Sequence, residues 1–133
     1  MEKVSLVVLF CDISGFMRLT RPLAERMSEL VQEFYEKAGD AVVDNGGTIL
    51  KYIGDAMLCV FPDGGEKGAV RAAVRMRGDF AALLRGYGSG QEAEVAAGIS
   101  CGEVTRGVFG HRSLRLDDVM GETVAHAAVL NSL

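Results

Sequence analysis

The sequence predicts an α+β fold, a mostly antiparallel sheet with its helices on one face. Two observations support this prediction. Several short apolar segments have the length and content of strands, and two longer segments repeat apolar residues every three or four positions, as amphipathic helices do. In chain order the pattern is strand, helix, strand, strand, helix, strand, strand and a short last helix, which fits one sheet covered by helices.

Composition limits the class of protein. The chain has 133 residues, so we expect one domain, residues 1–133, with its own core. The three cysteines show no paired spacing, which argues against a disulfide framework or zinc site and predicts reduced thiols in a cytoplasmic protein. A net charge of −4 without a Lys/Arg block argues against nucleic-acid binding. No apolar run approaches the roughly 18 residues of a spanning helix, so we expect no membrane insertion by this chain.

The first half of the chain predicts a strand, a helix and a hairpin. Residues 4–11 are almost all apolar, the pattern of a strand covered on both faces. Pro22 suits the first turn of a helix that continues to about Val42. Residues 48–53 and 56–61 then alternate as two strands joined by Gly54-Asp55, where the glycine permits a tight primed turn.

The second half predicts another helix, a strand pair and a short helix. Residues 66–85 have helical apolar spacing, and the glycine-rich residues 86–90 form a loop. Residues 94–101 and 103–109 are predicted as strands, and residues 121–133 as an alanine-rich helix. The Gly-x-Ser-x-Gly match at residues 98–102 is not expected to be a hydrolase elbow, because no helix follows the serine directly.

Two aspartates are candidate ligands for a metal ion. Asp12 ends the first apolar run, and Asp55 lies at the turn of the predicted hairpin. Two such carboxylates on neighbouring segments suit Mg²⁺ or Mn²⁺, since hard cations take oxygen ligands. Each alone is equally consistent with an ordinary turn residue. The backbone amides of Gly15 and Phe16 and the cation of Lys51 make a phosphate-handling site the better interpretation.

Three blocks of sequence, in order, resemble the signature blocks of the class III adenylyl/guanylyl cyclase catalytic domain. They are Phe10-Cys-Asp-Ile-Ser-Gly-Phe16, Gly46-Gly-Thr-Ile-Leu-Lys-Tyr-Ile-Gly-Asp55 and Asp118-Val-Met-Gly-Glu-Thr-Val124. The similarity spans nearly the whole chain, and three ordered blocks are far more specific than one. The resemblance implies the ferredoxin-like sheet of that family and its activity, the metal-dependent conversion of ATP to 3′,5′-cyclic AMP and pyrophosphate.

The resemblance assigns the phosphate half of the site. Asp12 and Asp55 are similar to the catalytic aspartates that hold two divalent metal ions, Mg²⁺ or Mn²⁺. The carbonyl of Ile13 is implied as a further metal ligand. The amides of Gly15 and Phe16 are implied as phosphate contacts.

The resemblance also assigns the base-reading half. Lys51 would donate to adenine N1, and Asp118 would accept from the 6-amino group. Guanine reverses both demands, because its N1 carries a hydrogen and its O6 accepts, so adenine is favoured. The resemblance therefore implies ATP as the substrate. In the family the two halves of the site come from different domains, which implies a homodimer as the working unit.

The chain departs from the family after the third block. The family has an asparagine that orients the ribose and, four residues later, an arginine that stabilises the transition state; here these positions hold Ala125 and Val129. Losing one such donor costs about 10²–10³ in rate, so the expected activity is weak. Arg106 and Arg112 are candidate substitute cations, with solvated surface charges as the default reading. The family's final strands, with a further phosphate-binding lysine, would follow Leu133.

Three functions therefore stay open at this point. The first is a weak adenylyl cyclase. The second is a noncatalytic domain that binds ATP and metal, or only dimerises, in signal transduction. The third is an interaction module that retains only the fold.

Overall fold

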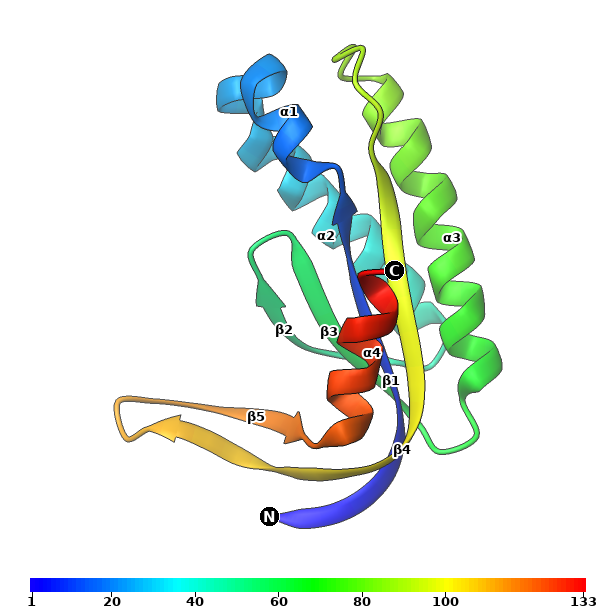
Figure 1. Cartoon of the computed structure of the whole chain (residues 1–133), viewed down its shortest axis with the longest axis vertical. Coiled ribbons are helices and arrows are strands. Elements are labelled where there is room, and N and C mark those ends of the chain that lie inside the picture. The colour runs from blue at the N-terminus through cyan, green and yellow to red at the C-terminus, as the bar shows by residue number, and fades with distance from the viewer.

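The computed structural model describes residues 1–133 as a five-stranded antiparallel sheet with the strand order β2-β3-β1-β4-β5 (Figure 1). The elements in chain order are β1 (Glu2–Ser14), α1 (Phe16–Leu23), the short 3₁₀ helix η1 (Ala24–Arg26), α2 (Met27–Asp44), β2 (Thr48–Ile53), β3 (Ala56–Pro62), α3 (Glu66–Arg85), β4 (Glu94–His111), β5 (Leu114–Met120) and α4 (Glu122–Asn131). The predicted α+β class and its mostly antiparallel sheet are confirmed.

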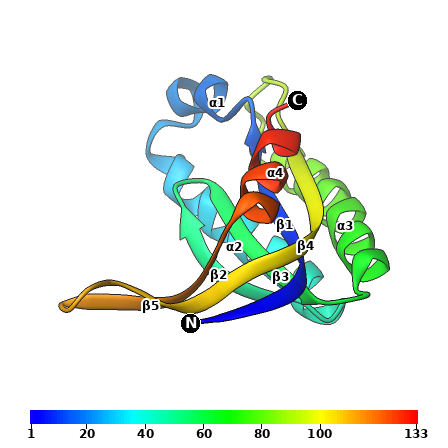
Figure 2. The same ribbon diagram turned by 60° about the horizontal axis from the view of Figure 1, so that its bottom comes forward.

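The helices divide between the two faces of this sheet. Helices α2 and α3 cover one face, as predicted, whereas α4 lies on the other, in front of β1 and β4 (Figures 1 and 2). The placement of all helices on one face is therefore corrected for α4. The physical reason lies in β1, whose side chains are buried on both faces, so that each face needs a cover.

The larger core lies under α2 and α3. Phe34 of α2 and Phe80 of α3 meet edge to face, with ring centroids 5.8 Å apart. This core contains 20 buried residues, among them Val7, Leu9, Cys11 and Ile13 from β1, Met57, Cys59 and Phe61 from β3, and Ala69, Ala72 and Met76 from α3. Burial of this apolar surface is the main favourable term in folding.

The smaller core lies under α4. Seven buried residues form it: Leu6, Val8, Leu58, Val60, Val104, Val119 and Ala127. Helix α4 lies unusually close to β4, because a Cβ on Gly98 would stand 2.0 Å from the Ala127 carbonyl oxygen. The glycines at 98 and 102 lie inside strand β4 and leave room for α4, so this stretch is no strand-to-helix elbow.

Several element boundaries differ from the predictions. The single helix expected from Pro22 is two helices, and Pro22 lies in the last turn of α1. Ala24, with φ of 45°, turns the chain between them. Strand β1 continues to Ser14, so Asp12 lies within the strand and not after it. By contrast, the hairpin turn at Gly54-Asp55 and the helix over residues 66–85 are confirmed.

The second strand pair also differs. The two strands predicted over residues 94–109 are one long strand, β4, which bends at Gly102 and continues to His111. Its partner β5 contains Arg115, Asp117 and Asp118, so its sequence lacks the apolar pattern from which a strand is predicted. The far half of this hairpin extends away from the body as an arm (Figure 2). In the chain as a whole, no helix combines the length and apolar character that crossing a membrane requires.

Candidate active site

The two aspartates come together at the end of β1. Asp12 lies on the α4 face of the sheet, because its neighbours Cys11 and Ile13 point into the larger core. Asp55 lies in the β2–β3 turn, and its Oδ2 accepts a hydrogen bond from the backbone N–H of Ile13 at 3.0 Å. That bond fixes the Asp55 carboxylate beside the residue that follows Asp12. The spatial meeting expected from the sequence is therefore present.

The β2–β3 turn is held from the helix side as well. Gly54 has φ of 58°, the left-handed conformation that glycine adopts without strain. The hydroxyl of Tyr35, from α2, donates to the Gly54 carbonyl. The pKa of Tyr35 is raised by burial first and then by the negative charge of Asp55. The sequence placed Tyr35 on a helix but gave no sign that it braces the turn carrying Asp55.

The electrostatics of this pair favour a cation. Burial raises the pKa of Asp12, and the charge of Asp55 raises it further, while a side-chain hydrogen bond from Asn131 acts in the opposite direction. No cluster of three or more Asp, Glu, His or Cys side chains suited to a metal exists anywhere in the chain. Two carboxylates fit Mg²⁺, which is commonly held by one or two carboxylates plus phosphate oxygens and water.

Gly15 and Phe16 form the start of α1, directly after β1. Gly15 is the residue before the helix and has φ of 86°, and an added Cβ would stand 3.1 Å from the Glu92 carbonyl oxygen. Phe16 is partly buried and packs against the larger core, which anchors the first turn. The first amides of a helix have no acceptor within the helix, so they are available to an anion near Asp12.

Lys51 and Asp118 form an ion pair between the two ends of the sheet. Lys51 Nζ lies 2.7 Å from Asp118 Oδ2, and the side chains are 32% and 10% exposed. Asp118 Oδ1 accepts a second hydrogen bond, from the backbone N–H of Val119, at 2.8 Å. The pair joins β2 and β5, the two outer strands of the sheet. The resemblance linked these two residues, and the structure brings them into contact across 67 positions of sequence.

The two positions at which the chain departs from the family pattern lie on the outer side of α4. Both Ala125 and Val129 are exposed, Val129 by 58%, and neither side chain can donate a hydrogen bond. The candidate substitute cations do not replace them. Arg106 is paired with Asp117 at 3.0 Å across the β4–β5 hairpin, and Arg112 lies in the connection at its far end.

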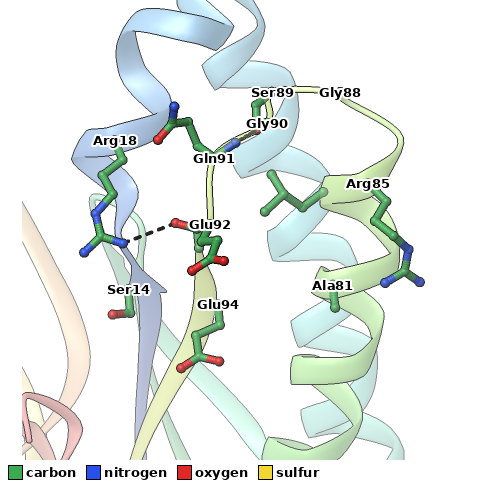
Figure 3. A pocket seen from close by; sticks show the side chains of 12 residues that line it. Ser14, Arg18, Ala81, Arg85, Gly88, Ser89, Gly90, Gln91, Glu92 and Glu94 are labelled. Carbon is green, nitrogen blue, oxygen red and sulfur yellow. Dashed lines mark hydrogen bonds between the residues drawn. The ribbon is translucent and has the colours of Figure 1, made fainter.

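A cavity of about 880 Å³ adjoins the start of α1, with Ser14 in its lining. It is bounded by α1, the end of α3 and the segment before β4, and Figure 3 shows Arg18 directed toward the carbonyl of Glu92. Its lining mixes Arg18 and Arg85 with Glu92 and Glu94, so no single charge prevails. It contains none of the residues that the sequence proposed for the site.

Asn131 is, after Tyr35, a second residue near the site that the sequence analysis missed. It lies one helical turn beyond Ala127 on the inner side of α4, and its side chain interacts with Asp12. Its Oδ1 atom is buried without a hydrogen-bond partner. The only signal was the spacing of Thr123, Ala127 and Asn131 at intervals of four, which places all three toward the sheet.

Comparison with known proteins agrees with this architecture. The model of the adenylate and guanylate cyclase catalytic domain family matches residues 1–133, and the chain belongs to that family. An adenylate cyclase of Streptomyces coelicolor is 34% identical over 131 residues, covering 96% of this chain and 30% of that protein. An adenylate cyclase of Anabaena cylindrica is 29% identical over 135 residues, covering 96% and 27%.

Solved structures show the same fold. The adenylyl cyclase CyaB from P. aeruginosa superimposes with a TM-score of 0.91 at 28% identity, covering 98% of this chain and 72% of that one. The guanylyl cyclase Cya2 gives a TM-score of 0.87 at 24% identity, covering 98% and 71%. The chain thus spans less than a third of the length of the two curated relatives and about seven-tenths of these structures.

Proposed function

We propose that this chain is an adenylyl cyclase domain that converts ATP to 3′,5′-cyclic AMP and pyrophosphate, slowly, between two copies of itself. The observation that supports this most directly is the meeting of Asp12 and Asp55, residues 43 positions apart, at one end of the central strand. The Ile13 N–H bond to Asp55 and the raising of the Asp12 pKa by the Asp55 charge both follow from that meeting.

In this proposal Asp12 and Asp55, with the carbonyl of Ile13, hold two divalent ions. When bound, these ions supply positive charge to the triphosphate and lower the barrier to attack by the ribose 3′-hydroxyl. The chain's own groups do the positioning: the Gly15 and Phe16 amides face the phosphates, and the turn held by Tyr35 keeps Asp55 in place. The new bond joins O3′ to the α-phosphorus, the bond from the α-phosphorus to the oxygen of the leaving pyrophosphate breaks, and the hydroxyl proton is released to solvent.

The Lys51–Asp118 pair selects adenine. An ammonium group has three donors, and one of them is used by Asp118, so two remain for adenine N1. Asp118 accepts one bond at each oxygen and retains lone pairs for the 6-amino group. Their ion pair therefore arranges both groups for adenine before the base arrives. Guanine would place an N–H against Lys51 and a carbonyl against Asp118, and both contacts would be repulsive.

A homodimer is supported by apolar surface that the single chain leaves uncovered. On the β4–β5 arm, Val108 is 60% exposed, Leu114 67% and Leu116 49%. On α4, Val129 and Leu130 are also about half exposed. Exposed apolar groups on both faces of a projecting arm fit contacts with another protein surface, and a second copy supplies the missing half of the proposed site.

The test is a cyclisation assay on the purified chain with ATP and Mn²⁺, with cyclic AMP measured by mass spectrometry. We expect slow product formation that disappears in Asp12→Ala, and calorimetry in parallel reports ATP binding. Lys67→Ala serves as the control, since Lys67 is exposed on α3 and belongs neither to the proposed site nor to the arm. Product that persists in Asp12→Ala would refute the assignment.

A noncatalytic ATP-binding or dimerisation domain is the second candidate, and the side chains of Ala125 and Val129 favour it. Binding of ATP without product would select this candidate. The double variant Ala125→Asn with Val129→Arg separates the two further, because it restores a donor at each position. We expect the variant to raise the rate of cyclisation by about 10²-fold or more. An unchanged rate in a folded, ATP-binding double variant would count against the roles given to these positions.

A further inference from the structure

We propose that Asn131 is a positioning residue for Asp12: its side-chain amide donates to that carboxylate and orients it for metal binding. This inference rests on the proposed function, in which Asp12 is a metal ligand. It adds a contact from α4, the helix whose outer positions 125 and 129 have no polar side chain.

The packing of α4 places Asn131 beside Asp12. Gly98 of β4 pairs with Phe10 of β1, and two residues along the same strands Ala96 pairs with Asp12. A Cβ on Gly98 would stand 2.5 Å from the backbone nitrogen of Asn131, so the end of α4 is seated directly on β4. The packing of α4 on β4 therefore places the backbone of Asn131 over this part of the sheet.

The chemistry of the amide sets its orientation. An ionised carboxylate only accepts hydrogen bonds, so the atom of Asn131 that faces Asp12 is the donor Nδ2. The other end of the amide, Oδ1, is then buried with no donor near it. A buried acceptor without a partner is unfavourable. The contact with Asp12 is therefore the interaction that determines how this amide lies.

This contact gives Asp12 a fixed direction. The Asp55 carboxylate, held beside Ile13, repels that of Asp12, and a donor from the end of α4 holds Asp12 from the other side. Hydrogen bonds to ligating carboxylates orient them, and losing such a partner typically costs about 10–100-fold in metal affinity. Asn131 therefore acts through Asp12 and touches neither ATP nor the reacting atoms in our proposal.

The first measurement is Mn²⁺ affinity by calorimetry on the full chain. We expect Asn131→Ala to weaken binding about 10-fold or more, and Asp12→Ala to abolish it. The matched control is Ser132→Ala, the next residue, which is exposed and bonds only the Val129 carbonyl. It should bind Mn²⁺ like the unaltered chain.

The second measurement keeps Asn131 in place, so it does not depend on how well Asn131→Ala folds. In a ¹⁵N-labelled chain, the side-chain NH₂ signal of Asn131 should shift in Asp12→Ala, while that of Asn45 should not. An unmoved Asn131 signal would overturn the proposal. So would Mn²⁺ binding that needs Asp12 but is equally tight in folded Asn131→Ala, and the proposed function would then stand. If the chain binds no Mn²⁺ through Asp12, both fail together.

Discussion

The two faces of the sheet are built differently. The face under α2 and α3 holds 20 buried core residues and none of the proposed polar site groups. The face under α4 holds seven buried core residues together with Asp12, whose neighbours Cys11 and Ile13 point into the larger core. One strand, β1, contributes to both, because its successive side chains point to opposite faces.

This difference separates stability from chemistry. The larger core supplies most of the apolar burial, so the rest of the molecule can accommodate two adjacent carboxylates and a partly buried ion pair. It also explains why α4 can lose polar side chains at 125 and 129 without loss of fold, since those positions face outward. Stability should therefore depend mainly on one face and nucleotide chemistry on the other.

The largest expected effect is on the α2–α3 face. Phe34→Ala should lower the free energy of unfolding by about 3–5 kcal/mol, because Phe34 is fully buried against Phe80. The matched variant is Phe10→Ala on the α4 face, where Phe10 is only partly buried and where we expect about 1–2 kcal/mol. Urea unfolding curves measure both. Equal losses, or a larger loss for Phe10→Ala, would break the proposed division between the faces.

A middle-sized effect is expected at the ion pair. Lys51→Met leaves the nearly buried carboxylate of Asp118 without its cation, and should cost about 1–3 kcal/mol. Adding Asp118→Asn to this variant removes the unpaired charge and retains an acceptor for the Val119 N–H, so stability should partly return. The double-variant cycle measures the coupling. Purely additive losses would show that the pair contributes nothing to folding.

The sequence predicted α3 and the β2–β3 hairpin well and the β4–β5 arm poorly. Helix α3 and the β2–β3 hairpin have strong periodic or turn signals, which act locally. Strand β5 has charged residues on an exposed hairpin, and its pairing with β4 is set by tertiary context that composition does not encode. The break between α1 and α2 at Ala24 was hidden because the apolar spacing continues across it.

The functional residues of the site could be named from motifs. The residues that hold them in place could not. Asp12, Asp55, Lys51 and Asp118 were identified by resemblance, and the structure shows which of them are in contact. Tyr35 and Asn131 belong to helices without a motif, and their contacts with the site depend on how α2 and α4 pack. The apolar run of residues 4–11 predicted a strand buried on both faces, but the prediction of helices on one face only left the second cover, α4, unassigned.

The smallest effect, and one of opposite sign, is expected at Asp12 itself. In the folded chain the pKa of Asp12 is raised above its usual 3.8. The folded chain therefore binds the Asp12 carboxyl proton more tightly than the unfolded chain does. Stability therefore falls as pH rises from 3.8 through the raised value, and the loss persists at neutral pH. Asp12→Asn has no carboxyl group to ionise, so it should be more stable than the unaltered chain at pH 7. The difference should be less than about 1 kcal/mol, because solvent screens a partly exposed group. The difference should vanish below 3.8, and added Mg²⁺ should stabilise only the unaltered chain. Thermal unfolding between pH 3 and 7 checks the sign, and a variant less stable than the parent at pH 7 would contradict it.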